Sequence, residues 1–340
     1  MTTAPAAWME TPCALCGSDE ARPWGVARGA PPLSAHAFPL VACVRCGLVY
    51  SRPRWASLEA LYQEAFRGQH GERFHRLIEA VIWWMEDRRA RTVARLRPPG
   101  ALLDIGCGRG IFLAALKRLG WQVAGTEVAL GVAGQAHRRQ LGVPVLAGDV
   151  LQLHFRDGQF DVVTLWHVLE HVPAPRATLQ KIRQVLQPDG WMVLGVPNLD
   201  SWQARCFGAR WLHLNLPYHL SQFSVGTLRR LLEAEGFSVV RVQHWHWLWV
   251  QNLCGWVQGL LDVVLPTKQL LLSSLQRSFG EWWRVQPLWR RAGVAIELIV
   301  SYALALCVLP LCLVLMCAES AARHGGTVCV LARQKVSDTF

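Results

Sequence analysis

Residues 102–110, with the sequence LLDIGCGRG, constrain the fold of this chain more than any other segment. An apolar run with one aspartate leads into glycines at three alternate positions, Gly106, Gly108 and Gly110. Glycine adopts the backbone conformations of a tight turn and leaves no Cβ between the main chain and a ligand. Apolar residues then recur at helical spacing from Ile111, so the pattern predicts a buried strand, a sharp turn and a helix. A ligand over this turn would meet backbone N–H groups and the positive end of the helix.

Three further apolar runs predict that this strand belongs to a parallel sheet. Residues 122–126 are predicted as the second strand, and Glu127 at its end stands where a carboxylate accepts ribose hydroxyls. Residues 145–149 and 160–167 predict the third and fourth strands. The spacing GxGxG, in place of GxGxxG, leaves no room for a pyrophosphate on the helix N-terminus, which argues against a dinucleotide. An α/β domain without any cofactor is the alternative.

At these motifs the chain resembles the class I S-adenosylmethionine-dependent methyltransferases of bacteria. The resemblance runs from residue 102 to about 237 and resumes near Gly326. It is carried, in order, by DIGCGRG, GTE, GDV, FDVVTLWHVLEHV and LQPDGWMVLGVPN. It implies a seven-stranded Rossmann-like α/β sheet and S-adenosylmethionine as the methyl donor.

The resemblance also implies which residues hold the donor. Glu127 would bind the ribose, while Asp149 and Val150 would face the adenine. The full set that we expect at the cofactor site is Asp104, Gly106, Cys107, Gly108, Gly110, Glu127, Asp149, Val150, Trp166 and His167.

Four cysteines near the start of the chain have the spacing of a zinc site. They form two CxxC pairs, each followed by a glycine: Cys13, Cys16, Cys43 and Cys46. Two such turns can arrange four thiolates tetrahedrally around Zn²⁺, and four cysteines leave no open coordination position, so the predicted ion is structural. A segment this short and rich in proline would take its folding energy from the metal. Such a module before the catalytic domain resembles sugar C-methyltransferases and a group of bacterial methyltransferases.

Two helices are predicted between the cysteine module and the glycine-rich turn, over residues 57–66 and 74–96. The second carries an apolar stripe beside a basic face and ends at Pro98. Two interpretations are equally open for it: a lid over the cofactor cleft, or a helix that only packs against the domain.

Polar residues at the end of the predicted fourth strand are candidates for the chemistry. Ligands of open α/β sheets bind beyond the carboxyl ends of the strands, and His167, Glu170 and His171 follow that end. The stretch resembles quinone O-methyltransferases, whose acidic and histidine residues here can hold a divalent ion, although His167 stands where those enzymes commonly carry a carboxylate. The three residues are therefore predicted to hold a metal, or one histidine acts as the base. For His171 a purely bracing role is an equal alternative.

A second candidate cluster follows the predicted fifth strand. Tyr218 and His219 leave the same sheet edge and form an alternative base or acceptor-binding pair. Neither cluster resembles the Asn/Asp-Pro-Pro-Tyr loop that acts on exocyclic amines of nucleobases. Nucleic acid is therefore an unlikely partner by this criterion, despite a formal net charge of +11.

The predicted sixth and seventh strands, at 238–243 and 327–334, are separated by an apolar, tryptophan-rich insertion. Residues 298–318 carry no charge over 21 positions, long enough to cross the hydrocarbon core, and Pro310 interrupts them. Both flanking strands must join one cytosolic sheet, so the insertion crosses a bilayer an even number of times. Its middle part is basic, which opposes export. Helices lying in the interface, the last one kinked or re-entrant, are therefore preferred over a two-span hairpin or a soluble oligomerisation surface.

Five segments result: a zinc ribbon over 1–54, a helical linker or lid over 55–98, the methyltransferase core over 99–243, the membrane-associating insertion over 244–320 and the last core strand over 321–340. The first ten residues lack the pattern of a signal peptide, so we expect the cytoplasmic face of the inner membrane, or alternatively the cytoplasm. The predicted activity is methylation, at oxygen, of a lipid-linked or apolar acceptor. A soluble sugar C-methyltransferase that oligomerises through the insertion, an RNA methyltransferase and a non-catalytic membrane scaffold are the alternatives.

Overall fold

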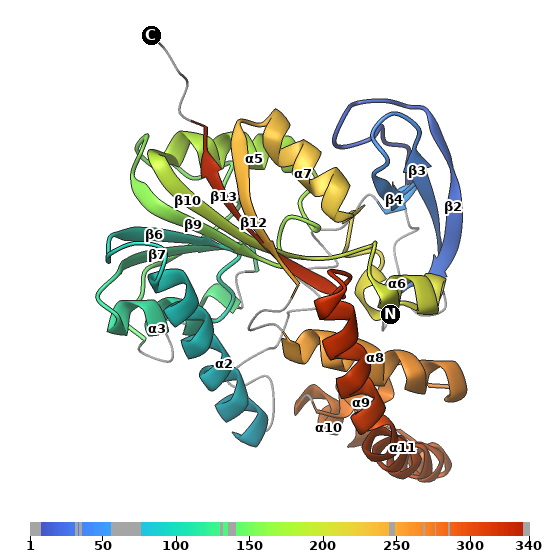
Figure 1. Ribbon diagram of the computed structural model, residues 1–340. Coiled ribbons are helices and arrows are strands. Elements are labelled where there is room, and N and C mark those ends of the chain that lie inside the picture. The colour runs from blue at the N-terminus through green and yellow to red at the C-terminus, as the bar shows by residue number, and fades with distance from the viewer. Residues whose placement is uncertain are drawn as a thin grey trace.

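The centre of the molecule is a seven-stranded sheet of order β12-β13-β10-β9-β6-β7-β8 (Figure 1). The computed structural model describes residues 8–30, 33, 36–55, 76–129, 132–134, 141–244, 249–267, 269–275, 277–284 and 286–335. The strands are β6 Ala101–Ile105, β7 Gln122–Glu127, β8 Val145–Ala147, β9 Phe160–Trp166, β10 Leu186–Pro197, β12 Phe237–Gln243 and β13 Thr327–Gln334. Strand β13 runs antiparallel to both of its neighbours, β10 and β12. The predicted fold class is confirmed, including a last strand that comes from beyond the insertion.

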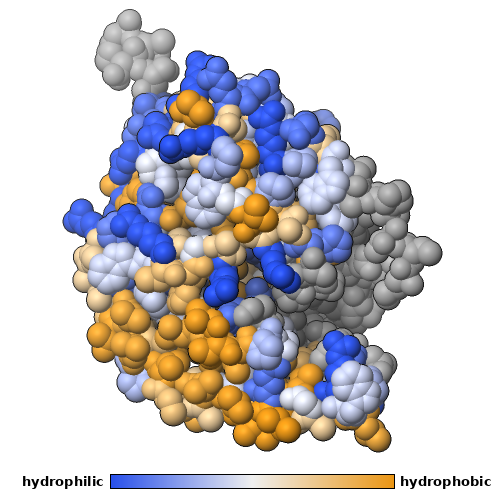
Figure 2. Space-filling view, turned by 90° about the vertical axis from the view of Figure 1, so that its right-hand side faces the viewer, coloured by the Kyte–Doolittle hydropathy of each residue, from blue (hydrophilic) through white to orange (hydrophobic). Residues whose placement is uncertain are grey.

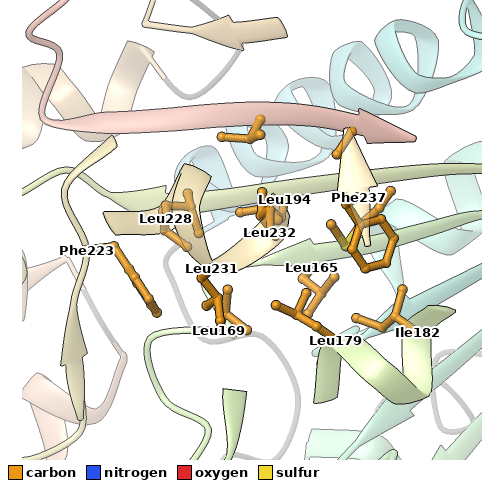
Figure 3. Packing of buried hydrophobic residues seen from close by; sticks show 14 of the residues in the cluster. Leu165, Leu169, Leu179, Ile182, Leu194, Phe223, Leu228, Leu231, Leu232 and Phe237 are labelled. Carbon is orange, nitrogen blue, oxygen red and sulfur yellow. The ribbon is translucent and has the colours of Figure 1, made fainter. Parts of the chain in front are cut away.

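Helices cover both faces of this sheet because successive side chains of each strand point to opposite faces. Leu102 and Val162 contribute to the cluster on one face, whereas Leu103 and Val163 contribute to the other. The first face is covered by α2 Arg76–Ala94 and α3 Ile111–Arg118, the second by α5 Pro175–Val185 and α7 Val225–Ala234. Figure 3 shows the second layer, in which leucines of α5 and α7 meet those of β9 and β10.

The predicted helix at 74–96 is present as α2, whereas the predicted helix at 57–66 lies outside the described residues. Short elements follow β10 and lead toward α7. They are α6 Trp202–Phe207, the 3₁₀ turns η1 Gly208–Arg210 and η2 Leu212–Leu214, and strand β11 Ser221–Gln222. Ser224 caps α7 by accepting the backbone N–H of Thr227, as expected for serine at this position.

The cysteine-bearing region forms two small sheets, and the larger one is joined to the catalytic domain. Its own strands are β1 Trp8–Met9, β2 Ala21–Arg28, β3 Ala37–Cys43, β4 Val49–Ser51 and β5 Arg54–Trp55. The larger sheet has the order β11-β4-β3-β2, so its edge strand β11 comes from the segment after β10. Cys13, Cys43 and Leu48 also belong to the same apolar cluster as the catalytic core. The two parts of the chain therefore share both a sheet and a core.

The insertion between β12 and β13 is helical, with α8 Trp249–Val264, α9 Leu270–Ser274, α10 Arg277–Arg284 and α11 Leu288–Ala321. Its helices lie together below the end of the sheet where β12 leaves and β13 enters (Figure 1). The expected interruption at Pro310 is wrong, because α11 continues through this proline as one helix. Proline removes one backbone hydrogen bond from a helix. Just beyond this proline, Cys312 and Met316 pack against Trp256 of α8, and this packing stabilises the helix there.

A buried polar network fixes the base of the insertion to the sheet. The amide nitrogen of Gln203 in α6 donates to the carbonyl of Asn252 at 2.9 Å and to Glu319 Oε1 at 2.8 Å. Asn252 Oδ1 in turn accepts from the backbone N–H and the hydroxyl of Thr327, both at 2.9 Å. Buried hydrogen bonds of this kind are costly to break. They therefore tie α6, α8 and α11 to the first residue of β13.

Candidate active site

The turn between β6 and α3 depends on glycine. Gly106, Gly108 and Gly110 have φ angles of 68°, 56° and 75°, which lie in the left-handed region. A Cβ on Gly106 would lie 2.4 Å from Cγ2 of Val168, whereas a Cβ on Gly108 would have nothing within 4 Å. Gly108 therefore borders open space at the carboxyl edge of the sheet, where its backbone is accessible to a ligand.

Glu127, at the end of β7, is held against this turn by both carboxylate oxygens. Oε2 accepts the backbone N–H of Gly108 at 3.0 Å, and Oε1 accepts that of Ala129 at 2.9 Å. Burial raises the pKa of Glu127, and the two N–H groups oppose that rise by stabilising the charged form. Each carboxylate oxygen has a further lone pair. The residue is therefore oriented to accept hydroxyl groups of a ligand that lies over the turn.

The remaining predicted cofactor residues surround the turn in different ways. Asp104 is buried and accepts the hydroxyl of Thr164 on the neighbouring strand at 2.6 Å, and burial raises its pKa to about 7. Cys107 is buried beside Gly125, and Val150 is buried in the core. Asp149 accepts the backbone N–H of Leu151 at 2.9 Å and so shapes the turn after β8.

Helix α2 contacts both the sheet and the glycine-rich turn. Ala90 and Val93 are buried against the sheet, so part of the helix packs. Nearer its start, Glu79 accepts two hydrogen bonds from Arg109 of the glycine-rich turn, at 2.7 and 2.8 Å. The guanidinium of Arg89 lies 4.7 Å from the ring centroid of Trp166, at the end of β9. The helix therefore packs against the domain and also contacts the cofactor turn.

The first acceptor-side cluster forms where β9 ends. His167 has a φ of 55°, an unusual conformation for a residue with a side chain. Its Nδ1 lies 3.1 Å from Oε1 of Glu170. Glu170 is 1% exposed, and its Oε2 and the Nε2 of His167 have no hydrogen-bond partner among the described residues. Buried polar atoms of this kind are rare in folded proteins, so they mark a place where a ligand is expected.

His171 and His219 bring the two predicted clusters together. Their ring centroids are 4.5 Å apart in an edge-to-face arrangement. His171 Nδ1 donates to the carbonyl of Tyr218 at 2.9 Å, and His219 Nδ1 donates to the carbonyl of His213 at 2.7 Å. A carbonyl oxygen only accepts, so the proton of each ring is on Nδ1 and the lone pair is on Nε2. Both rings therefore present the form that acts as a base or as a metal ligand.

The possible metal ligands differ from the predicted set. Ligand atoms of Glu170, His171 and His219 all lie within 4.8 Å of one another. His167 was expected as the third member, but it is not part of this group, and its Nδ1 is hydrogen-bonded to Glu170. The expectation rested on adjacency in the sequence, whereas the fold supplies His219 from 48 residues farther along the chain.

His213 joins this cluster and was not among the predicted residues. Burial lowers its pKa to about 3, with His167 as a further cause, and the 3₁₀ turn η2 that carries it packs against α8. The pKa of His171 and that of His219 are also lowered by burial. A single histidine in an irregular loop carries no sequence signal for such a position, because its neighbours come from β9 and α8. His213 therefore connects the histidine cluster to the insertion.

The four N-terminal cysteines form one compact group. The Sγ atoms of Cys13 and Cys46 are 3.4 Å apart, and those of Cys16 and Cys43 are 3.5 Å apart. Four sulfurs at about 2.3 Å from a tetrahedral zinc ion would be about 3.8 Å apart, so the group fits the ion closely. Burial alone would raise the pKa of Cys43, but the backbone of Cys46 and Arg45 and the neighbouring thiols lower it to about 7. Gly17 and Gly47, with φ of 70° and 76°, permit these turns.

Comparison with known proteins agrees with this arrangement. The sequence model of a methyltransferase-domain family matches residues 71–242. A ubiquinone biosynthesis O-methyltransferase from Paraburkholderia xenovorans is 36% identical over 34% of this chain and 53% of its own length. A protein of the same name from Burkholderia thailandensis is 30% identical over 43% of this chain and 68% of its own length. This chain thus spans between about half and two thirds of these relatives.

Solved structures of methyltransferases resemble this chain more distantly. One from Archaeoglobus fulgidus aligns over 81% of this chain and 99% of its own, with 18% identity and a TM-score of 0.45. A possible histamine N-methyltransferase from Thermotoga maritima aligns over 76% and 96%, with 18% identity and a TM-score of 0.43. The assignment is therefore based on the family match and the curated relatives. The chain belongs to the class I S-adenosylmethionine-dependent methyltransferases.

Replacing Glu127 by glutamine should weaken binding of S-adenosylmethionine by about 10–100-fold, the loss of one or two hydrogen bonds to a charged group. A glutamine amide would also place NH₂ against one of the two N–H groups that Glu127 now accepts. Isothermal titration calorimetry of the purified protein with S-adenosylmethionine measures the affinity. Glu233→Gln on the exposed surface of α7 is the matched control and should bind as the wild type. Equal affinities of all three proteins would contradict the assigned role.

The protein should lose stability as the pH falls below 6.5. Buried His171, His213 and His219 have lowered pKa values in the folded state, and for His213 the value falls from 6.5 to about 3. Between these values the unfolded chain binds more protons than the folded chain, so acid favours unfolding. Urea unfolding at several pH values measures how the free energy of unfolding changes with pH. His213→Gln should show a shallower decline, and a decline identical to that of the wild type would contradict the assignment.

Proposed function

We propose that this enzyme methylates an oxygen of a lipid-linked or otherwise apolar acceptor at the cytosolic surface of the membrane. The observation that carries the proposal is the contact between the acceptor-side loop and the insertion, where η2, which includes His213, packs against α8. Apolar helices that border the histidines would let a membrane-bound acceptor reach them without entering water. The ubiquinone biosynthesis O-methyltransferases among the relatives support oxygen as the target.

The histidines have the protonation state that such a reaction requires. S-adenosylmethionine, when bound at the glycine-rich turn, supplies a methyl group on a positively charged sulfur. The acceptor oxygen would form the new bond to the methyl carbon as the bond from sulfur breaks, and its proton would pass to Nε2 of a neutral imidazole. Burial keeps His171 and His219 neutral near pH 7. We assign the base to this pair, with Tyr218 fixing His171 through its carbonyl.

A divalent cation is a second way in which the same residues would act. Glu170, His171 and His219 offer one carboxylate oxygen and two imidazole nitrogens. Both imidazoles already carry their proton on Nδ1, and each Nδ1 is held by a carbonyl, as is usual for metal-binding histidines. An ion bound there would lower the pKa of an acceptor hydroxyl. In that case His167 would orient the carboxylate of Glu170 through their hydrogen bond.

The surface of α11 supports attachment to a bilayer. It is the one described helix that is long and apolar enough to cross a membrane, and only 11% of its most apolar window is buried. Exposed apolar residues continue along it from Leu288 and Trp289, which are 80% and 77% exposed, to Val314. Figure 2 shows hydrophobic residues gathered over the lower part of one face, at the level of the insertion helices. Exposed patches of this kind mark interaction surfaces.

The sheet topology favours helices that lie in the interface over helices that span the bilayer. Strands β12 and β13 pair with each other, so both ends of the insertion return to one sheet. Arg290, next to the exposed Trp289, is itself exposed, and so is Arg284 at the end of α10. Arginine and tryptophan together suit the headgroup region of a membrane. We therefore place the enzyme on the cytosolic face, attached through α11.

Removing apolar side chains from α11 should release the protein from vesicles. The triple variant Ile299→Ser, Leu306→Ser, Val314→Ser loses about 1.5–3 kcal/mol of burial per side chain, and all three residues are more than half exposed. Its matched control replaces Val26, Val44 and Val240 by serine; these residues are also more than half exposed and lie outside the insertion. Flotation with phospholipid vesicles should fail for the α11 variant alone. Flotation of both variants would contradict the proposed surface.

Incubation with labelled S-adenosylmethionine and a total membrane lipid extract should methylate a component of that extract. His171→Gln should lower the rate by about 10²–10⁴-fold, because it removes the base or a metal ligand, and donor binding should stay unchanged. Mass analysis identifies the product. Transfer to a water-soluble sugar, with none to the lipid extract, would contradict the proposal in favour of a sugar methyltransferase.

A further inference from the structure

The loop that carries His213 and His219 leads directly into β11, and β11 is the edge strand of the sheet in the cysteine module. Strand β11 pairs antiparallel with β4, so that Ser221 lies opposite Tyr50 and Gln222 opposite Val49. Strand β4 belongs to the N-terminal sheet and β11 follows His219 by one residue. The cysteine module therefore contacts the acceptor side of the site by backbone pairing.

The path from the cysteines to this strand is short and hydrogen-bonded. Cys46 is followed by Gly47 and Leu48 and then directly by β4. The backbone N–H of Gly47 donates to the carbonyl of Cys43 at 2.9 Å, and that of Cys43 donates to the carbonyl of Leu48 at 2.9 Å. The position of β4 is thus set by the turn that carries Cys43 and Cys46.

Gln222 connects β11 to the histidines. Its side chain is 2% exposed, and its Nε2 donates to the carbonyl of Leu214 at 3.1 Å and to that of His219 at 3.4 Å. These carbonyls lie at the two ends of the turn that separates His213 from His219. The side chain of Gln222 therefore holds the two ends of this turn together. The hydrogen bond from His219 Nδ1 to the carbonyl of His213 holds them together as well.

The same strand is fixed to the end of β9. The backbone N–H groups of Leu220 and Ser221 both donate to the carbonyl of Glu170, at 2.8 and 3.1 Å. His219 is thereby held beside Glu170 and His171. Apolar packing adds to this, since Leu40 and Val49 of the cysteine module share a cluster with Trp211 and Leu214.

We propose that the cysteine module, held together by zinc, positions the acceptor-side histidines through strand β11, and that Gln222 is a positioning residue of the site. The inference rests on the proposed function. The glycine-rich turn follows β6, and Glu127 is the last residue of β7; neither strand pairs with β4 or β11 in the described sheets. Loss of this support should therefore impair transfer to the acceptor and spare binding of the methyl donor.

The test compares Gln222→Met, which keeps the length of the side chain and removes the donor, with the matched control Gln184→Met. Gln184 donates to Asp157 at the surface of α5. For Gln222→Met we expect unchanged zinc content, unchanged donor affinity, faster amide hydrogen exchange over residues 211–222 and a turnover reduced by about 10–100-fold, the range for residues that orient ligands. The control should match the wild type in all four measurements.

Removal of zinc from the wild type by a chelator provides a second, independent test of the positioning role. Donor binding should persist, and amide exchange over 211–222 should rise as in Gln222→Met. Unchanged exchange in both arms, or full turnover by the zinc-free protein, would overturn the proposal. If the wild type transfers no methyl group to the lipid extract, the proposed function fails, whereas the exchange and zinc measurements still decide the positioning role.

Discussion

The pairing of β13 between β10 and β12 determines where the second half of the chain lies. Because β13 is antiparallel to both neighbours, the chain leaves the carboxyl end of β12 and must return to that same end. All of the apolar helices α8 to α11 are consequently placed at the edge where a parallel sheet binds its ligands. The hydrogen bonds of Asn252 and Glu319 fix that placement, since they join α8 and α11 to the residues at the start of β13. An insertion at the opposite edge, where the parallel strands begin, would not border the active site.

Burial has opposite consequences on the two sides of the site. On the donor side, backbone N–H groups hold Glu127 as a hydrogen-bond acceptor against a turn that only glycine can form. On the acceptor side, burial disfavours the charged imidazolium and so keeps His171, His213 and His219 neutral. The cost of burying His171 and His219 is partly offset by the carbonyl oxygens that accept from their Nδ1 atoms. A neutral imidazole in a site with little water is suited to accept a proton from an apolar hydroxyl compound.

Local sequence motifs were sufficient to predict the fold. They were not sufficient to predict which residues meet on the acceptor side, because those residues are brought together by contacts between distant segments. Glycines at Gly106, Gly108 and Gly110 specify a turn by their own backbone properties, so the sequence was sufficient there. His213 and His219 take their positions from β11, which pairs with a strand some 170 residues earlier. A two-residue strand carries too little pattern to be predicted. Pro310 was expected to interrupt the apolar stretch, but α11 continues through it, and Cys312 and Met316 just beyond it pack against α8. The predicted helix at 57–66 lies outside the described residues.

The central claim is that the methyl-transfer site and a membrane surface meet along the insertion. Photo-crosslinking in vesicles that contain a photoactivatable phospholipid tests it most directly, with peptide mapping of the labelled protein. The account predicts label on the exposed residues of α11 between Ile296 and Val314, and none on α5 or α7, which lie at the opposite end of the molecule (Figure 1). Label on α5 or α7, or no label on α11, would contradict it.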